Sequence, residues 1–192
     1  DYRGKLHNPM TRRLLGIAYA MLDPVYQGGA SRGDRSHVLI SFGAMDTEKL
    51  AVKVLSILEP AVHGRQVVFH VPLSSVSPCL AELKQFISRS GLDINVYVDL
   101  PDLTGLYQQC GIAIGAPGIS LLERIYCGLE NLTIVTAQNQ EQVGRNYSDC
   151  GIAPCLGVAR RLDPGVLAER FLQMLESPDA GADTSGHSGM VD

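Results

Sequence analysis

Several features are missing from this sequence, and each absence excludes a class of function. There is no excess of basic residues: 16 Lys and Arg stand against 20 Asp and Glu, for a net charge of -4. General nucleic-acid binding is therefore disfavoured, because it needs a basic face. No apolar run approaches the roughly 20 residues that cross a bilayer, and no signal-like segment opens the chain. Because the chain starts at Asp1 rather than Met, we expect it to be a fragment of a longer protein.

Patterns that bind metals or form disulfides are also missing. The five cysteines are scattered, no C-x-x-C pair occurs, and the five histidines do not cluster with Cys or Asp at zinc spacing. We therefore predict no disulfide framework, no metal site and no cofactor, in a reducing cytoplasm. No Ser-His-Asp, Cys-His or paired-carboxylate arrangement is legible, so the sequence names no catalytic residue.

From residue 37 onward, short apolar strands alternate with helices. The patterns predict strands at 38–42, 66–71, 94–98, 111–114, 132–135 and 152–156. They predict helices at 47–58, 77–90, 102–110, 119–127, 139–150 and 164–175. The strands are apolar throughout, as expected when both faces of a sheet are covered. The sequence therefore predicts an α/β fold, a doubly wound, Rossmann-like parallel sheet whose ligands bind beyond the carboxyl ends of the strands.

The length of 192 residues suits one domain with a full core. We expect residues 1–35 to be an irregular linker between domains and residues 36–176 to form the Rossmann-like domain. The remaining residues, 177–192, are rich in Gly, Ser, Asp and Ala and predict a mobile tail.

The most informative stretch follows the predicted fourth strand. Gly115 and Gly118 form a turn that opens a helix, with Ser120 at its mouth and Glu123 in its first turn. The glycines allow positive φ or close backbone approach. The first N–H groups of a helix lack internal partners, so this turn suits a diphosphate, and Glu123 could accept bonds from ribose hydroxyls. Alternatively, Ser120 and Glu123 form a capping box that serves only the helix itself.

Two more turns lie at the same predicted edge. Gly43 follows the first strand and could let backbone N–H groups approach phosphates, although Asp46 or Thr47 could simply cap the next helix. After the fifth strand, Asn139 and Gln140 offer amides that suit sugar hydroxyls, although Asn139 could equally be a helix cap.

The third strand and the histidines give weaker signals. Backbone groups near Asp99 could pair with a base edge, or Asp102 could cap the next helix in an ordinary loop. His70 is predicted to end the second strand and so to approach the crevice or to be a hydrogen-bonded loop residue. His37 is predicted to precede the first strand, on the far edge.

Taken in order, these motifs resemble the UDP-sugar hydrolases of pseudaminic acid biosynthesis, a superfamily that includes spore-coat polysaccharide proteins. The resemblance runs from about Leu14 to about Leu175. The matching segments are 14–24, 38–43 with Asp46, 115–124, 127–129, 138–140 and, near the C-terminus, 189–192.

The resemblance implies one half of a glycosyltransferase-B-like fold, which has two Rossmann-like domains. Such proteins remove UDP from a 2,4-diacetamido-2,4,6-trideoxy sugar by attack of water at the anomeric carbon. This chain resembles the C-terminal, UDP-holding domain; the N-terminal Rossmann-like domain, with the catalytic histidine, is missing, so we expect the chain alone to be inactive. By this resemblance Gly43 and the turn 115–120 contact the diphosphate, Glu123 the ribose, Asn139 and Gln140 the phosphate or sugar, and Asp99 and Leu100 the uracil.

The turn departs from the family pattern, which has Gly-Gly-Ser-Thr at positions 117–120. Ile119 lacks the family's hydroxyl and Pro117 lacks an N–H donor. Two alternatives therefore stay open: a non-catalytic binding module of a multidomain polysaccharide-synthesis protein, and the donor domain of a glycosyltransferase that uses an acceptor in place of water.

Overall fold

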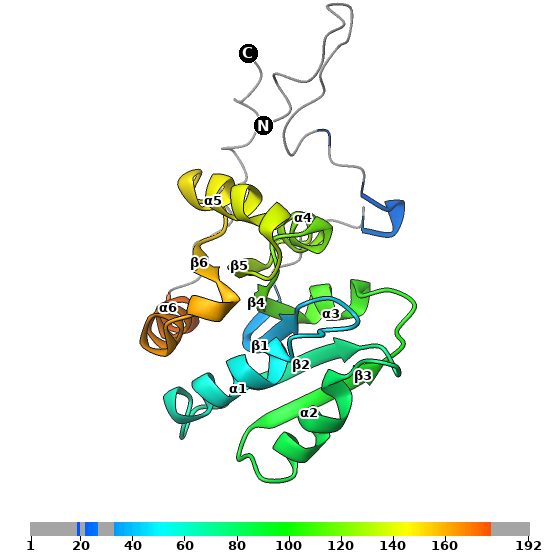
Figure 1. The fold of residues 1–192 in the computed structure, drawn as a ribbon, viewed down its shortest axis with the longest axis vertical. Coiled ribbons are helices and arrows are strands. Elements are labelled where there is room, and N and C mark those ends of the chain that lie inside the picture. The colour runs from blue at the N-terminus through cyan, green and yellow to red at the C-terminus, as the bar shows by residue number, and fades with distance from the viewer. Residues whose placement is uncertain (1–18, 20–21, 27–32, 178–192) are drawn as a thin grey trace, which may run out of the picture.

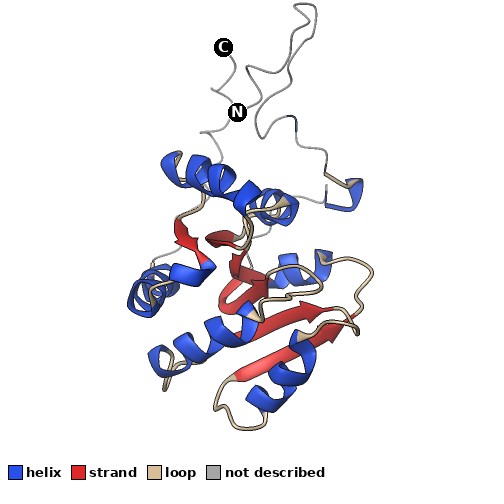
Figure 2. Ribbon diagram, viewed as in Figure 1, coloured by secondary structure: helices blue, strands red, loops and turns tan. Residues whose placement is uncertain are grey.

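The protein forms a six-stranded parallel sheet between two layers of helices (Figures 1 and 2). The computed structural model describes residues 19, 22–26 and 33–177. The strands are β1 (Asp34–Ser41), β2 (Val68–Leu73), β3 (Asp93–Val98), β4 (Cys110–Gly115), β5 (Glu130–Val135) and β6 (Cys155–Val158). The predicted α/β fold with a parallel sheet is confirmed.

A helix follows each strand, as the sequence predicts. The α-helices are α1 (Leu50–Ala61), α2 (Cys79–Ile87), α3 (Thr104–Gln109), α4 (Ile119–Tyr126), α5 (Glu141–Asp149) and α6 (Pro164–Glu176). The described part of the chain also contains the short 3-10 helices η2 (Pro24–Tyr26), η3 (Gln138–Gln140) and η4 (Ala159–Arg161). Within the described residues, no helix is both long and apolar enough to cross a bilayer.

The strand order is β3-β2-β1-β4-β5-β6, and every pair is parallel. The chain winds outward from β1 in one direction and then outward from β4 in the other. The order therefore reverses between β1 and β4, which makes their carboxyl ends the topological switch point where doubly wound sheets bind ligands.

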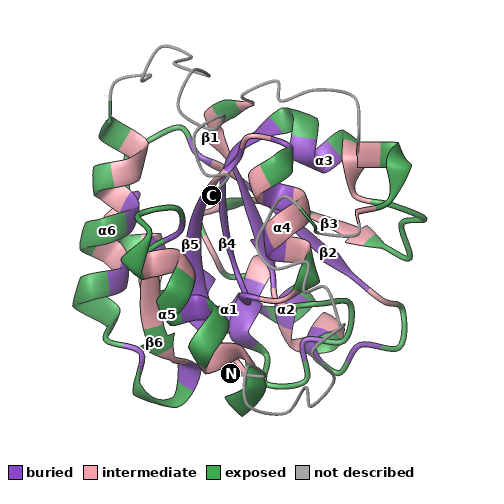
Figure 3. Ribbon diagram, turned by 90° about the horizontal axis from the view of Figure 1, so that it is seen from above, coloured by how far each residue is buried: buried purple, intermediate pink, exposed green. Residues whose placement is uncertain are grey.

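Two apolar clusters cover the two faces of the sheet, because alternate strand residues point in opposite directions. The larger cluster packs side chains of α1, α2 and α6 against one face. The smaller joins Leu39 of β1 and Ala113 of β4 to side chains of α3. Seen from above, β4 and β5 are buried along most of their length (Figure 3). β3 is an edge strand, and it is exposed at alternate positions over its first half.

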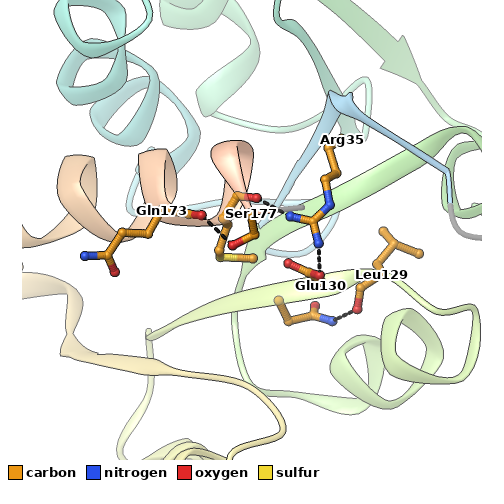
Figure 4. A network of polar contacts seen from close by, with 7 residues as sticks. Arg35, Leu129, Glu130, Gln173 and Ser177 are labelled. Atoms are coloured by element: carbon orange, nitrogen blue, oxygen red, sulfur yellow. Dashed lines mark hydrogen bonds and ion pairs between the residues drawn. The ribbon is translucent and has the colours of Figure 1, made fainter. Parts of the chain in front are cut away.

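Arg35 ties the amino ends of the strands to the last helix (Figure 4). Its guanidinium donates to the carboxylate of Glu130, at the start of β5, and to the carbonyl of Met174 in α6. This network lies at the edge of the sheet opposite the switch point, so it holds the fold together without entering the crevice.

Several predicted boundaries need correction. Strand β1 begins at Asp34 and β6 at Cys155, where the sequence predicts residues 38 and 152. Polar residues opening β1 carry no apolar pattern and so escaped the prediction. The predicted helix 139–150 splits into η3 and α5. Asn139 lies inside η3 and makes no side-chain cap, so the alternative in which it caps the helix is wrong. Residues 14–18, 20–21 and 189–192 of the resemblance, and the predicted tail beyond residue 177, lie outside the described residues.

The positions predicted for His37, before the first strand, and for His70, at the end of the second, are wrong. His37 lies within β1, and His70 is in the middle of β2, opposite Leu39, because β2 continues to Leu73. His70 is 1% exposed, with its Nε2 2.9 Å from Nδ1 of His37 and its Nδ1 2.9 Å from Oη of Tyr97. His70 therefore belongs to a row of hydrogen-bonded side chains across the sheet, His37–His70–Tyr97, and does not reach the crevice.

The buried position of His70 in this row of side chains predicts that the protein loses stability in mild acid. Burial, and then the neighbouring His37, lower the pKa of His70 below its usual 6.5, while Asp93 opposes the shift. The unfolded chain binds a proton there as pH falls through about 6.5, whereas the folded chain does not, so the free energy of unfolding decreases. We expect the midpoint of urea unfolding to fall between pH 7.5 and pH 5.5, and to fall further for the wild type than for His70→Gln. An equal fall in both proteins would show that His70 is not the source of the pH dependence.

Candidate functional site

The loops that follow β1 and β4 lie side by side at the switch point. Ser41 and Gly115 are register partners, and the Ala116 N–H donates to the Ser41 carbonyl at 3.4 Å. Gly43 has φ 90, a left-handed conformation that favours glycine. The loop after β2 joins this edge, since the Ser74 N–H donates to the carbonyl of Ala44 at 2.8 Å.

The helix after β1 has its first amides occupied. Asp46, buried and with φ 36, accepts from the N–H groups of Leu50 and Ala51, both at 2.9 Å. Asp46 therefore satisfies the first amides of α1, but the N-cap residue is Lys49, so the prediction that Asp46 or Thr47 is itself the N-cap is wrong. Because a carboxylate already neutralises this helix start, α1 does not offer its N-terminus to an anion.

The helix after β4 is different. Its N-cap is Gly118, with no side-chain cap. The N–H groups of Ile119 and Ser120 have no acceptor among the described residues. Ser120 lies inside the helix rather than at its cap, so the predicted capping box is wrong. Its side chain instead accepts from Arg124 at 3.3 Å. Two unfilled backbone donors therefore remain at the switch point.

The two glycines of this turn have different roles. A Cβ at Gly115 would lie 2.2 Å from the Ser41 carbonyl oxygen, so this glycine serves the close approach of β1 and β4. Gly118 has φ -103, so the alternative of a positive φ is wrong there, and its surroundings are open. Pro117 is buried against Gly144 of α5, whereas Ile119 is 72% exposed.

Glu123 points to neighbouring side chains rather than to its own helix start. Its Oε2 accepts from the hydroxyl of Tyr107 in α3 at 2.9 Å. Burial, and then the nearby Glu123 carboxylate, raise the pKa of Tyr107. The ring of Tyr26 lies 5.6 Å from that of Tyr107, and burial, followed by the Glu123 carboxylate, raises the pKa of Tyr26. The half-buried carboxylate of Glu123 is thus held by α3, at the side of the glycine turn.

Arg124 lies directly behind the turn, and the sequence analysis missed it. The side chain is fully buried, and its Nη2 donates to the Ala116 carbonyl at 3.1 Å. Its Nε donates to Oδ1 of Asn131 at 2.7 Å. The sequence contains one usable signal: an arginine on the apolar face of an amphipathic helix needs a buried partner.

The loop after β5 places one amide next to the turn. Oε1 of Gln140 accepts from both the N–H and the hydroxyl of Thr136, each at 3.0 Å. Because a backbone N–H can only donate, this pair fixes the orientation of the amide. The Nε2 then faces the turn, 4.0 Å from a Cβ built at Gly118. Asn139 is exposed, with no side-chain hydrogen bond among the described residues.

The loop after β3 joins the other side of the edge. Asp99 has φ 52 and accepts from the Ser75 N–H at 2.9 Å and the Ser74 hydroxyl at 3.1 Å. Leu100 is exposed beside it. Asp102 accepts from the Thr104 N–H at 2.9 Å, but the N-cap of α3 is Leu103, so Asp102 stands one residue before the cap position predicted for it. The Asp99 carboxylate is engaged within the protein, so the loop can offer backbone groups and the Leu100 side chain.

A pocket of about 400 Å³ opens beyond the ends of β5 and β6. Its lining combines two carboxylates, a guanidinium and polar groups of the β5 loop: Glu48, Glu141, Arg160, Thr136 and Gln138. A lining that offers both hydrogen-bond donors and hydrogen-bond acceptors suits a polyhydroxylated ligand such as a sugar. The pocket shares Thr136 with the Gln140 contact, so it adjoins the glycine turn.

Comparison with known proteins gives one informative sequence relative. The chain is 25% identical over 173 residues to the spore coat polysaccharide biosynthesis protein SpsG of Bacillus subtilis, covering 87% of this chain. The chain spans about half the length, 50%, of that curated relative. No protein-family model matches the sequence.

Solved structures agree on the fold. The spinosyn rhamnosyltransferase SpnG complexed with thymidine diphosphate superposes with TM-score 0.55 at 16% identity, covering 80% of this chain and 40% of that one. MurG of Acinetobacter baumannii gives 0.57 at 17% identity, covering 83% and 46%. WaaG, a glycosyltransferase involved in lipopolysaccharide biosynthesis, gives 0.55 at 15% identity, covering 80% and 41%. The chain therefore has an α/β fold whose structural neighbours are GT-B glycosyltransferases.

Proposed function

We propose that residues 36–176 form a domain that binds a UDP-linked sugar, with the diphosphate seated on the turn 115–120. The observation that carries this proposal is the start of α4. At the switch point it presents two N–H groups without acceptors among the described residues, whereas Asp46 fills the start of α1. Helix N-termini with free amides favour anions.

In this proposal the other residues contact different parts of the ligand. The diphosphate is bordered by Gly43 and by the turn 115–120, which includes Gly115, Gly118 and Ser120. Glu123 accepts hydrogen bonds from the ribose hydroxyls. Asp99 and Leu100 border the uracil. Gln140 turns its amide N–H group toward the turn, and Asn139 is exposed nearby. The pocket beyond β5 and β6 then takes the sugar.

The proposed reaction is hydrolysis of the nucleotide sugar, a UDP-linked diacetamido-trideoxy sugar, in surface-polysaccharide or pseudaminic-type acid biosynthesis in the cytoplasm. Water forms a bond to the anomeric carbon as the bond from that carbon to the β-phosphate oxygen breaks, and UDP leaves. A missing N-terminal Rossmann-like domain would supply the catalytic histidine. The name of the 25% identical relative supports a role in polysaccharide biosynthesis.

A second function uses the same site with a different acceptor. The structural neighbours are glycosyltransferases, and one of them is complexed with thymidine diphosphate. This favours a donor domain that transfers the sugar to a hydroxyl instead of water. The residues of this chain serve both reactions equally, because the acceptor would bind on the other half.

Calorimetry with the 192-residue chain tests nucleotide binding. We expect UDP to bind with a Kd of about 0.1–1 mM and more tightly than uridine, because the diphosphate contacts add to the base and ribose contacts. We also expect no UDP release from UDP-sugars by the chain alone. No heat with millimolar UDP would contradict the proposal and favour a non-catalytic docking module.

Ile119→Ser provides a matched variant for this measurement. The side chain of Ile119 is 72% exposed, so the substitution leaves the core intact. It restores a hydroxyl donor at the turn, and we expect UDP to bind about threefold to tenfold more tightly, as one added hydrogen bond allows. Unchanged UDP affinity would show that the diphosphate does not lie at this turn.

A further inference from the structure

Arg124 is a buried cation that is not directly paired with a carboxylate. The side chain is 0% exposed. Among the described residues, no carboxylate oxygen lies within 4 Å of its guanidinium. Burial lowers the pKa of Arg124, and the attraction of the adjacent Glu123, which raises that pKa, only partly offsets the lowering. The Glu123 carboxylate is hydrogen-bonded to Tyr107 rather than paired with the guanidinium. Burying an uncompensated charge is costly, so its presence calls for an explanation.

The guanidinium braces the turn from behind. It donates to the Ala116 carbonyl at 3.1 Å and to the Ser120 hydroxyl at 3.3 Å, and these two residues flank the Pro117–Ile119 segment. Its third bond, to Asn131, anchors it to β5 at 2.7 Å. All three acceptors are neutral. The positive charge therefore lies immediately behind the two free N–H groups of α4, on the protein side of the turn.

Gly115 makes this arrangement possible. A Cβ at that position would lie 2.8 Å from Nη1 of Arg124, so only glycine leaves room for the guanidinium. Desolvation by burial lowers the pKa of Arg124 to about 10, which still leaves it charged at neutral pH. The guanidinium can attract an anion on the other side of the turn through the backbone that separates them, because the protein interior screens charges weakly.

We propose that Arg124 is a positioning residue for the diphosphate. It holds the turn in its binding shape, and the bound diphosphate compensates its buried charge. The inference rests on the proposed nucleotide site, and it assigns the anion preference of that site to a side chain that never touches the ligand.

The test compares UDP with uridine, which lacks the phosphates, by calorimetry on the 192-residue chain. We expect Arg124→Gln to weaken UDP binding about tenfold and to leave uridine binding within about twofold, because only the diphosphate senses the lost charge. Arg124→Lys keeps the charge and should recover part of the UDP preference. Equal losses for UDP and uridine, or a lysine variant no better than glutamine, would overturn the proposal.

Asn131→Asp keeps the test decisive if the Arg124 variants do not fold. Aspartate has the shape of asparagine and retains the acceptor for Nε. It loses the Nδ2 donor to the Leu129 carbonyl, at 2.8 Å, but pairs the guanidinium with a carboxylate inside the protein, which offsets that loss. We expect a folded variant with about tenfold weaker UDP binding and unchanged uridine binding. A UDP preference that survives both substitutions overturns this inference alone. A wild type that binds UDP no more tightly than uridine overturns the proposed function itself.

Discussion

Gly115→Ala is expected to cost about 3 kcal/mol or more of unfolding free energy, the range of severe overpacking in a core. The added methyl would lie 2.2 Å from the Ser41 carbonyl oxygen and 2.8 Å from Nη1 of Arg124. Neither neighbour can move freely, because Ser41 belongs to the β1–β4 ladder and Arg124 is fixed by three hydrogen bonds. Urea unfolding followed by circular dichroism measures the change.

Gly118→Ala is the matched control for this prediction. It lies three residues further along the same turn, with φ -103, and the nearest atom to its Cβ is 4.0 Å away. We expect the unfolding free energy to change by about 0.5 kcal/mol or less. A Gly115 variant as stable as the Gly118 variant would show that β1 and β4 are not packed as closely as described.

The order of elements was predictable because each strand and each helix has its own local pattern. Continuous apolar runs such as 111–114 mark buried strands, and the helical spacing after them is regular. The carboxyl-edge turns followed from that order, since parallel strands present their ends on one edge. Gly43, Gly115 and Gln140 therefore could be placed at one edge from the sequence alone.

What the sequence could not show is which groups satisfy one another across the fold. The capping box 120–123 is a local pattern, yet other partners replace it: the Tyr107 hydroxyl of α3 donates to Glu123, and Arg124, one helical turn further on, donates to Ser120. His70 is predicted to end a strand, but β2 continues beyond it through Pro72 to Leu73. The Tyr107–Glu123 contact and the pairing of β2 with its neighbours join distant segments, and they override the local pattern.

Glu123→Ala is expected to weaken UDP binding by about tenfold to hundredfold, because a hydrogen bond to a charged acceptor contributes about 1.5–3 kcal/mol. In the proposed site the carboxylate accepts from ribose hydroxyls, so the loss depends on those hydroxyls. The affinity for 2′-deoxy-UDP should therefore fall much less than that for UDP. Calorimetry with both nucleotides on the variant and the wild type gives the comparison.

Tyr107→Phe separates ligand binding from the support of Glu123. Both variants lose the 2.9 Å bond between the Tyr107 hydroxyl and the carboxylate, but only Glu123→Ala loses the carboxylate itself. We expect Tyr107→Phe to keep the preference for UDP over 2′-deoxy-UDP, with UDP affinity within about threefold of the wild type. If both variants lost UDP binding equally, Glu123 would act through the packing of α3 against α4. If neither did, the ribose would lie elsewhere, and the carboxylate would serve only to satisfy the buried tyrosine.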